Sequence, residues 1–163
     1  MKELMKSNIH DVDETIIVVG SCLKSVQPKG YEQLQKISNN IYELCLEETH
    51  INMSITKIGG MLRTNKIKRI IFASVDRSPH CIQLHYIQDE LQKMMDLSNI
   101  EIENYVIVNN ELIKISTEII ALSKNLSKLS KLEIKGNWFE WTIDKIQQIS
   151  TGKYSFIEIL PQI

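Results

Sequence analysis

Residues 69–75, RIIFASV, form a continuous apolar run with several β-branched side chains, and this run decides the fold. A run of this length and composition predicts a strand that is buried on both faces, as in a parallel sheet. Pro79 follows soon after and prevents the strand from continuing. A second apolar run, residues 15–20, TIIVVG, predicts a strand before it, and residues 100–108, IEIENYVIV, predict a strand after it.

Amphipathic helices are predicted between and after these strands. Apolar side chains recur at spacings of three and four from Pro28 to near Glu48, from Pro79 onward, and from Asn110 onward, where Asn110 is the expected N-cap of a long helix. The apolar positions of these three helices are Leu34, Ile37, Ile41, Leu44 and Cys45, then Leu84, Ile87, Leu91 and Met94, then Leu112, Ile115, Ile119, Leu122, Leu126 and Leu129. Buried strands that alternate with such helices predict βαβ units.

The segment 50–55 fits two structures. Its apolar side chains alternate, which predicts a short strand, but Ser54 is also a suitable N-cap for a helix that ends near Asn65. At the other end of the chain, the pattern predicts a last helix near 138–150 and an edge strand over 154–160.

These elements together predict a single α/β domain over residues 1–163. The expected architecture is an open, mainly parallel sheet of the Rossmann-like or flavodoxin-like kind, with helices on both faces and the C-terminal strand at an edge. The composition agrees, because 163 residues of which 43% are hydrophobic are enough to bury one ordinary core.

Charge and composition argue against two classes of partner. The chain has 19 basic and 20 acidic side chains, whereas a nucleic-acid-binding protein usually has a basic excess. No apolar stretch approaches the roughly 18 residues that span a bilayer, and the polar N-terminus does not have the pattern of a signal peptide. We therefore expect a cytoplasmic protein that binds neither nucleic acid nor membrane. Three cysteines without an export signal predict free thiols or ligands rather than disulfides.

Chemistry is expected at the carboxyl ends of the strands, where ligands bind in open parallel sheets. Cys22 follows the first strand, and the segment after the middle strand is the richest in reactive side chains. That segment contains Asp76, Arg77, Ser78, His80, Cys81, His85 and Tyr86.

The first interpretation of these residues is a metal centre. Cys81 and His85 are four positions apart in the expected helix, so both would lie on one face, and Cys22 would join them from the neighbouring strand. Two sulfurs and an imidazole, with His80 as the alternative imidazole, suit zinc or an iron–sulfur cluster.

The second interpretation is a small-anion site. The free N–H groups at the start of a helix opened by Ser78 favour a phosphate or carboxylate, and Arg77 would assist. A third interpretation makes Cys81 a nucleophile with His80 or His85 as its base.

Each of these side chains also has a purely structural interpretation. Cys81 can be a small apolar filler, His85 a histidine at the edge of the core, Cys22 an incidental loop residue, and Cys45 a structural residue on its helix. Asp76 and Arg77 can simply pair with each other. The chain contains no Gly-x-Gly-x-x-Gly, Walker-type or Cys-x-x-Cys motif, which disfavours ordinary nucleotide and thioredoxin-like sites.

Three segments together resemble a known family. IIVVGSC, then KRIIFASVDRSPHCIQLHY, then YVIVNNELIKISTEII are similar to the iron–sulfur (delta) subunit of methyl-viologen-reducing hydrogenases, over roughly residues 15–129. The resemblance implies a small iron–sulfur cluster and electron transfer between larger redox subunits. Pro79-His80-Cys81 and His85-Tyr86 correspond to the central motif of that family. The segment INMSIT lacks the expected cysteine, so the resemblance implies mixed Cys/His ligation or loss of the cluster.

The sequence as a whole predicts a redox-accessory or metal-binding domain that relays electrons or handles a metal. Its partner would be a larger redox protein, and a homodimer is compatible with the sequence. The alternative is a non-catalytic module that binds a small anion or another protein.

Overall fold

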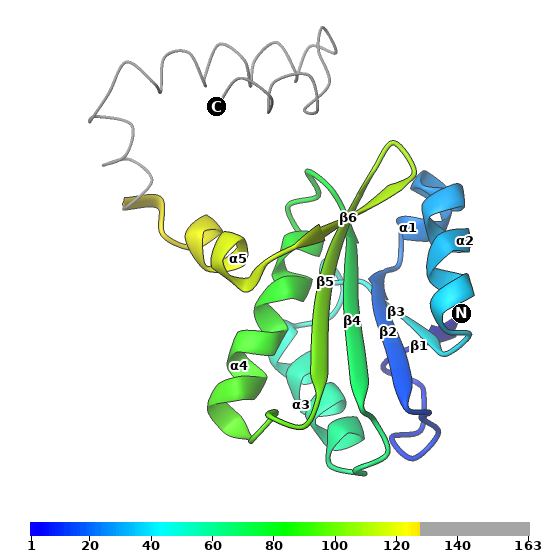
Figure 1. Cartoon of the computed structure of the whole chain (residues 1–163), viewed down its shortest axis with the longest axis vertical. Helices are drawn as coiled ribbons and strands as arrows, with labels where there is room; N and C mark the ends of the chain where they lie inside the picture. Colours follow the sequence, from blue (N-terminus) through cyan, green and yellow to red (C-terminus); the bar gives the residue numbers. More distant parts are fainter. Residues whose placement is uncertain (128–163) are drawn as a thin grey trace, which may run out of the picture. The chain divides into compact units, whose positions relative to one another are not determined.

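The computed structural model describes residues 1–127 and shows an α/β fold (Figure 1). The chain divides into two compact units, Met1–Ile120 and Ala121–Ile163, and the sheet belongs to the first. Six strands of the described residues form one sheet in the order β1-β3-β2-β4-β5-β6. Their bounds are β1 Lys2–Glu3, β2 Thr15–Gly20, β3 Ile41–Leu44, β4 Arg69–Val75, β5 Glu101–Val108 and β6 Glu111–Ile115.

Strands β1 to β5 all run parallel to one another, and β6 runs antiparallel to β5. Helices cover both faces, as predicted. The helical elements are α1 Leu23–Val26, α2 Pro28–Ile37, α3 Ile51–Leu62, the 3₁₀ helix η1 Cys81–Tyr86, α4 Ile87–Met94 and α5 Thr117–Ser123. The open, mainly parallel sheet expected from the sequence is therefore confirmed.

The two faces of the sheet carry two separate cores. Alternate residues of β2 and β4 point to opposite sides, so that Ile71 and Ala73 pack with α1 and α2, while Ile70 and Phe72 pack with α3, η1 and α4. All four of these side chains are almost completely buried. Burial on both faces explains why β2 and β4 have continuous apolar sequences, and both strands have the predicted bounds.

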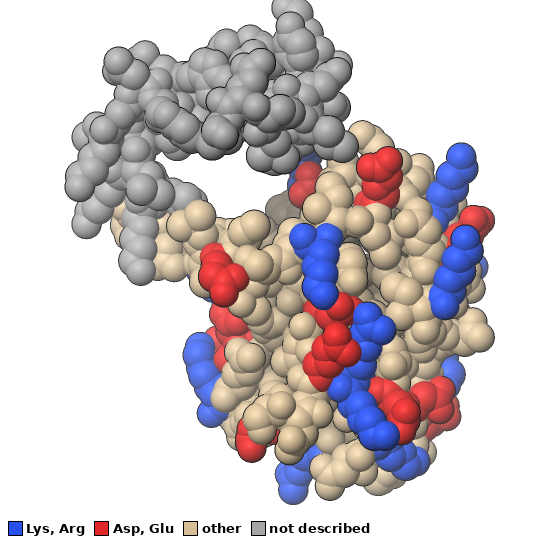
Figure 2. Space-filling model, viewed as in Figure 1, with Lys and Arg blue, Asp and Glu red and all other residues tan. Residues whose placement is uncertain are grey.

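A cluster of charged side chains spans the neighbouring strands β4, β5 and β6. Arg69 and Lys114 both form ion pairs with the buried carboxylate of Glu103. Burial raises the pKa of Glu103, but these two pairs outweigh it and hold the pKa below its usual value. Figure 2 shows basic and acidic side chains intermixed on this side of the molecule. The intermixing agrees with the even charge balance of the sequence.

The predicted helix from Pro28 to Glu48 is wrong in its second half. Helix α2 ends at Ile37, and residues 41–44 form the buried strand β3 beside β2. Ile41 and Leu44 are three positions apart, which fits a helix, but β3 is parallel to β2 on one side and to β1 on the other, and this pairing determines its structure. Cys45 consequently follows a strand and does not lie on a helix.

The segment 50–55 is helical. Helix α3 begins at Ile51, so the strand interpretation is wrong, and Ser54 lies inside the helix rather than at its cap. The buried hydroxyl Oγ of Ser54 has no hydrogen-bond partner.

The long helix predicted from Asn110 is also wrong at its start. Asn109 and Asn110 both have left-handed backbone angles, with φ of 49° and 66°, which is the geometry of a type I′ hairpin turn between β5 and β6. The later positions 117–123 form the short helix α5. Met94, predicted in the core, is 69% exposed. The predicted helix near 138–150 and edge strand over 154–160 lie outside the described residues, and the single domain over 1–163 stays a prediction.

Within residues 1–127, no helix has both the length and the apolar character needed to cross a membrane.

Candidate functional site

Two of the cysteines meet at the carboxyl edge of the parallel sheet. Cys22 lies two residues after the end of β2, at the N-cap of α1. Cys81 is the first residue of η1, which follows β4. Their sulfur atoms are 3.8 Å apart, and both thiols are free. Cys22 is half-buried, and Cys81 is 9% exposed. The sequence predicted this convergence, because the carboxyl ends of parallel strands lie at the same edge.

Gly20, the last residue of β2, makes room for this pair. A Cβ atom at Gly20 would lie 2.7 Å from the sulfur of Cys81 and 3.9 Å from the sulfur of Cys22. The first distance is too short for any side chain, so the absence of a Cβ lets the sulfur of Cys81 rest directly on the strand end. Gly20 was predicted as the last residue of the first strand, but its contact with the sulfur of Cys81 was not predicted.

The environment of Cys22 favours its neutral thiol. Burial raises the pKa of Cys22, and the nearby sulfur of Cys81 raises it further, both by its charge and by its contact. Cys45 makes a smaller contribution in the same direction. Cys45 is close because it follows β3, which pairs with β2, and the N–H of Ser21 donates to the carbonyl of Leu44. All three cysteines therefore gather near this edge, although the sequence analysis assigned Cys45 to a helix.

His85 is held by a buried polar network. Its Nε2 lies 2.8 Å from Ser74 Oγ, and its Nδ1 lies 2.8 Å from Asn104 Oδ1. Asn104 Nδ2 in turn donates to Gln88 Oε1 at 2.6 Å. The exposed fraction of each of these four residues is 2% or less. Burial lowers the pKa of His85, and its hydrogen bond to Asn104 opposes this only in part. The imidazole is therefore neutral near pH 7.

The network also fixes the tautomer of His85. Asn104 Nδ2 donates to Gln88, so Asn104 Oδ1 faces the imidazole and can only accept a hydrogen bond. Nδ1 of His85 must then carry the proton, and Nε2 accepts from the hydroxyl of Ser74. Both ring nitrogens of His85 have hydrogen-bond partners in this arrangement, so its role as a metal ligand stays a prediction. The placement is the one expected of a core histidine.

The remaining predicted residues lie around the same loop. His80 is exposed, and its Nδ1 is 3.8 Å from Glu47 Oε2. The hydroxyl of Ser78 accepts the backbone N–H of Cys81 at 3.3 Å, so one of the N–H groups expected to hold an anion already has a partner.

Asp76 and Arg77 form the turn directly after β4. Arg77 has a left-handed φ of 62°, and its Nε is 3.9 Å from Asp76 Oδ2 in an exposed ion pair. Tyr86 ends η1 and is half-buried.

Cys81 and His85 were predicted to lie on one helical face, but the observed helix type changes this. Residues 81–86 form a 3₁₀ helix with three residues per turn, so positions four apart do not share a face. Among the described residues, no group of three or more His, Cys, Asp or Glu side chains is arranged to hold a metal ion. The metal, anion and nucleophile roles of these residues stay predictions.

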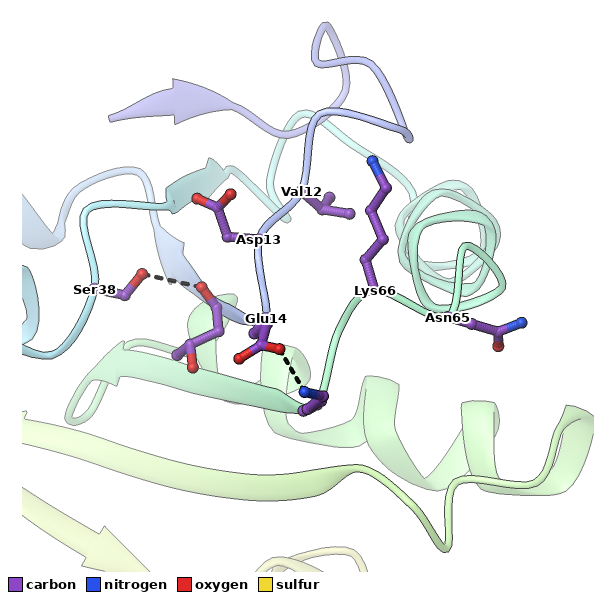
Figure 3. Close-up of a pocket in the computed structure, with 8 residues that line it drawn as sticks. Val12, Asp13, Glu14, Ser38, Asn65 and Lys66 are labelled. Atoms are coloured by element: carbon purple, nitrogen blue, oxygen red, sulfur yellow. Dashed lines mark hydrogen bonds and ion pairs between the residues drawn. The ribbon is translucent and has the colours of Figure 1, made fainter.

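A pocket of about 690 Å³ lies at the opposite, amino end of β2 and β4 (Figure 3). The hydroxyl of Ser38 donates to the carbonyl of Thr15 at 3.0 Å beside it, and Lys68 pairs with Glu14. Its lining residues are Val12, Asp13, Glu14, Thr15, Ser38, Asn65, Lys66 and Lys68. Acidic and basic groups are mixed in this lining, so it has no clear preference for a charged ligand.

Sequence comparison identifies one relationship. The family model described as Rossmann-like domain matches residues 12–137. No curated protein and no solved structure matches the chain. The resemblance to the hydrogenase delta subunit stays a prediction.

Proposed function

This chain belongs to the Rossmann-like domain family, and we propose that it is a redox-accessory domain whose working groups are the thiols of Cys22 and Cys81. In this proposal the pair cycles between a dithiol and a disulfide and so passes two electrons at a time. The electrons are exchanged with a dithiol or disulfide of a larger redox protein.

The observation that supports this proposal is the distance of 3.8 Å between the two sulfurs. Sulfurs in a disulfide are about 2.05 Å apart, so the two sulfurs have to approach each other by less than about 2 Å to form the bond. The two thiols belong to different segments, and the fold already holds them in contact. Such an arrangement lowers the entropic cost of forming the bond.

The difference in exposure suggests the order of events. The thiolate of half-buried Cys22 attacks one sulfur of the partner's disulfide, which forms a mixed disulfide and releases one partner thiol. The thiolate of the more buried Cys81 then attacks the sulfur of Cys22, and the second partner thiol leaves. The domain loses two electrons and two protons, and the partner disulfide gains them. The reverse sequence reduces the domain.

Equilibration with mixtures of reduced and oxidised glutathione tests the proposal. We expect an intramolecular disulfide between residues 22 and 81, seen by mass spectrometry as the loss of two hydrogen atoms and located by peptide mapping. Cys22→Ser and Cys81→Ser should remain as thiols or mixed disulfides, whereas the control Cys45→Ser should behave like the wild type. A wild-type protein that forms only mixed disulfides, or a bond to Cys45, would contradict the proposal.

The same pair suggests a second candidate function, the handling of a soft metal ion. Two thiolates bound to a tetrahedral zinc ion at about 2.3 Å lie about 3.8 Å from each other, which equals the observed sulfur–sulfur distance. His80 is exposed next to Cys81 and is the nearest candidate for a further ligand in the sequence. Zinc titration and anaerobic iron–sulfur reconstitution, followed by metal analysis and visible absorbance, test this alternative. It predicts stoichiometric metal that Cys22→Ser abolishes and Cys45→Ser retains.

A further inference from the structure

We infer that His85 is a positioning residue, which holds η1 against the sheet so that Cys81 faces Cys22. This inference rests on the proposed function, because it concerns the same pair of thiols. The anchor is the contact of the His85 imidazole with Ser74 of β4 on one side and with Asn104 of β5 on the other, at 2.8 Å each.

The element that carries Cys81 has little support of its own. It is a six-residue 3₁₀ helix, a helix type whose hydrogen bonds have poorer geometry than those of an α-helix. At its start, the N–H groups of Cys81 and Ile82 bond to Ser78, at 3.3 and 3.2 Å. η1 continues directly into α4 at Ile87, so the position of its Cys81 end over the sheet depends on its own side chains as well as on α4.

The buried side chains of η1 are Cys81, Leu84 and His85, and the last two position the helix in different ways. Leu84 is 1% exposed in the apolar core, and apolar packing of this kind is not directional. His85 makes two directional bonds to two neighbouring strands, which fix both the rotation of η1 and its place along the sheet. Cys81 stands at the opposite end of the same short helix, so a rotation of η1 moves its sulfur relative to Cys22.

Ser74, His85 and Asn104 are linked in the order of a catalytic serine–histidine–aspartate triad, with asparagine in the place of the aspartate. The burial of these residues favours a positioning role. Ser74 is 2% exposed and His85 is 1% exposed, so a substrate has no access to the hydroxyl. The fourth member, Gln88, lies on α4, and its Nε2 has no hydrogen-bond partner. The network thus connects β4, η1, α4 and β5 and ends inside the protein.

A matched pair of serine substitutions tests the inference in the full-length protein. Ser74→Ala removes the hydroxyl that bonds to His85. Ser54→Ala removes an equally buried hydroxyl that has no partner and serves as the control. Ser74→Thr keeps a hydroxyl at the anchor and serves as the rescue variant. Thermal unfolding of each variant first establishes that it is folded.

Two measurements report on the thiols. The first is the equilibrium constant of the Cys22–Cys81 disulfide against glutathione. The second is capture by a trivalent phenylarsenical, which bridges two close thiols without oxidising them. We expect Ser74→Ala to weaken both by about tenfold, the ratio that corresponds to one lost buried hydrogen bond. Ser54→Ala should change neither, and Ser74→Thr should recover most of the loss.

Equal values for folded Ser74→Ala and the wild type in both measurements would overturn the inference and leave the proposed function intact. The opposite failure is also recognisable. If the wild type forms no disulfide but captures the arsenical, and Ser74→Ala weakens this capture, then the redox proposal fails while the positioning role of His85 stands.

Discussion

The side-chain oxygen Oδ1 of Asn110 accepts the backbone N–H of Lys29 at 3.1 Å, so the β5–β6 turn caps the N-terminus of α2. Two further bonds strengthen this contact, because Asn110 N–H donates to Gln27 Oε1 at 2.6 Å and Gln33 Nε2 donates to the carbonyl of Asn110 at 2.8 Å. Asn110 was predicted as an N-cap, but of the helix that follows it rather than of α2. The hairpin and α2 are thereby joined across 81 positions of the chain.

Substitution of Asn110 separates its role as the cap of α2 from its role as a turn residue with left-handed backbone angles. Asn110→Gly keeps the left-handed backbone and loses the cap, whereas Asn110→Ala loses the cap and also strains a backbone with φ of 66°. We expect Ala to lower the free energy of unfolding by about 2 kcal/mol and Gly by about 1 kcal/mol or less. Urea denaturation measures both. Equal stability of the Ala variant and the wild type would show that the cap is unimportant.

The parts of the fold that the sequence predicted are those where local pattern and tertiary structure agree. β2 and β4 are buried on both faces and therefore have continuous apolar runs. β3 and β6 have only four and five residues, and the apolar side chains of each include two that are three positions apart. Their strand conformation comes from pairing with distant segments, which a local pattern does not report.

Gly20→Ala should disturb the thiol pair more than the fold. Glycine is not needed here for its backbone angles, but a Cβ would lie 2.7 Å from the sulfur of Cys81. We expect this sulfur to rotate away from Cys22, which would reduce the equilibrium constant of the disulfide severalfold at a stability cost of about 1–3 kcal/mol. The glutathione equilibrium and urea denaturation measure these effects.

Gly59→Ala is the control for Gly20→Ala, because its Cβ would meet only Leu91 at 3.4 Å. The thiol equilibrium of this variant should match the wild type. If Gly20→Ala also leaves the equilibrium unchanged, the close approach between Gly20 and the sulfur of Cys81 does not affect the thiol pair.

Stability should fall on acidification below the ordinary pKa of histidine. Burial holds the pKa of His85 below its usual value of 6.5, so the unfolded chain takes up a proton at a higher pH than the folded protein does. This contribution to stability is complete above about pH 6.5 and is lost as the pH falls toward the folded pKa, by at most about 1.4 kcal/mol per pH unit. Urea denaturation between pH 7.5 and 5.5 measures the slope.

One histidine variant and one control assign that slope. His85→Gln should flatten it, because glutamine keeps hydrogen-bonding capacity without titrating in this range. Ser54→Ala changes a buried side chain that does not titrate and should leave the slope as in the wild type. An unchanged slope in His85→Gln would mean that other groups cause the acid sensitivity.

Alkylation of Cys22 should require a higher pH than that of an ordinary thiol. Burial raises the pKa of Cys22, and Cys81 and Cys45 add to the effect in that order. We expect Cys81→Ala to shift the midpoint of the pH–rate profile downward but not fully to the ordinary value, because burial remains. Cys45→Ala should shift it less. Iodoacetamide labelling followed by peptide mass spectrometry measures the rates, and a midpoint below that of a model thiol would contradict this prediction.

The candidate site was predicted only where the sequence pattern and the tertiary structure agree. Parallel topology places Cys22 and Cys81 at the same edge of the sheet, so the sequence was sufficient for this part, whereas the room that Gly20 leaves for the sulfur of Cys81 was not predicted. The neighbourhood of His85 was not predicted either, because a 3₁₀ helix replaced the expected α-helix and turned this side chain into the core. The available signal was the polar residue Ser74 inside the buried run of β4 and the polar residue Asn104 inside β5, since such residues need partners once they are buried.

The two thiols are 59 positions apart in the chain, so in the proposed redox cycle this separation would link the oxidation state to the lifetime of the protein. A covalent cross-link over a loop of that length restricts the denatured ensemble and is worth about 4 kcal/mol in the loop-entropy description. The oxidised form would resist proteolysis and heat far better than the reduced form. An oxidant would thus govern how long the molecule survives as well as what it does.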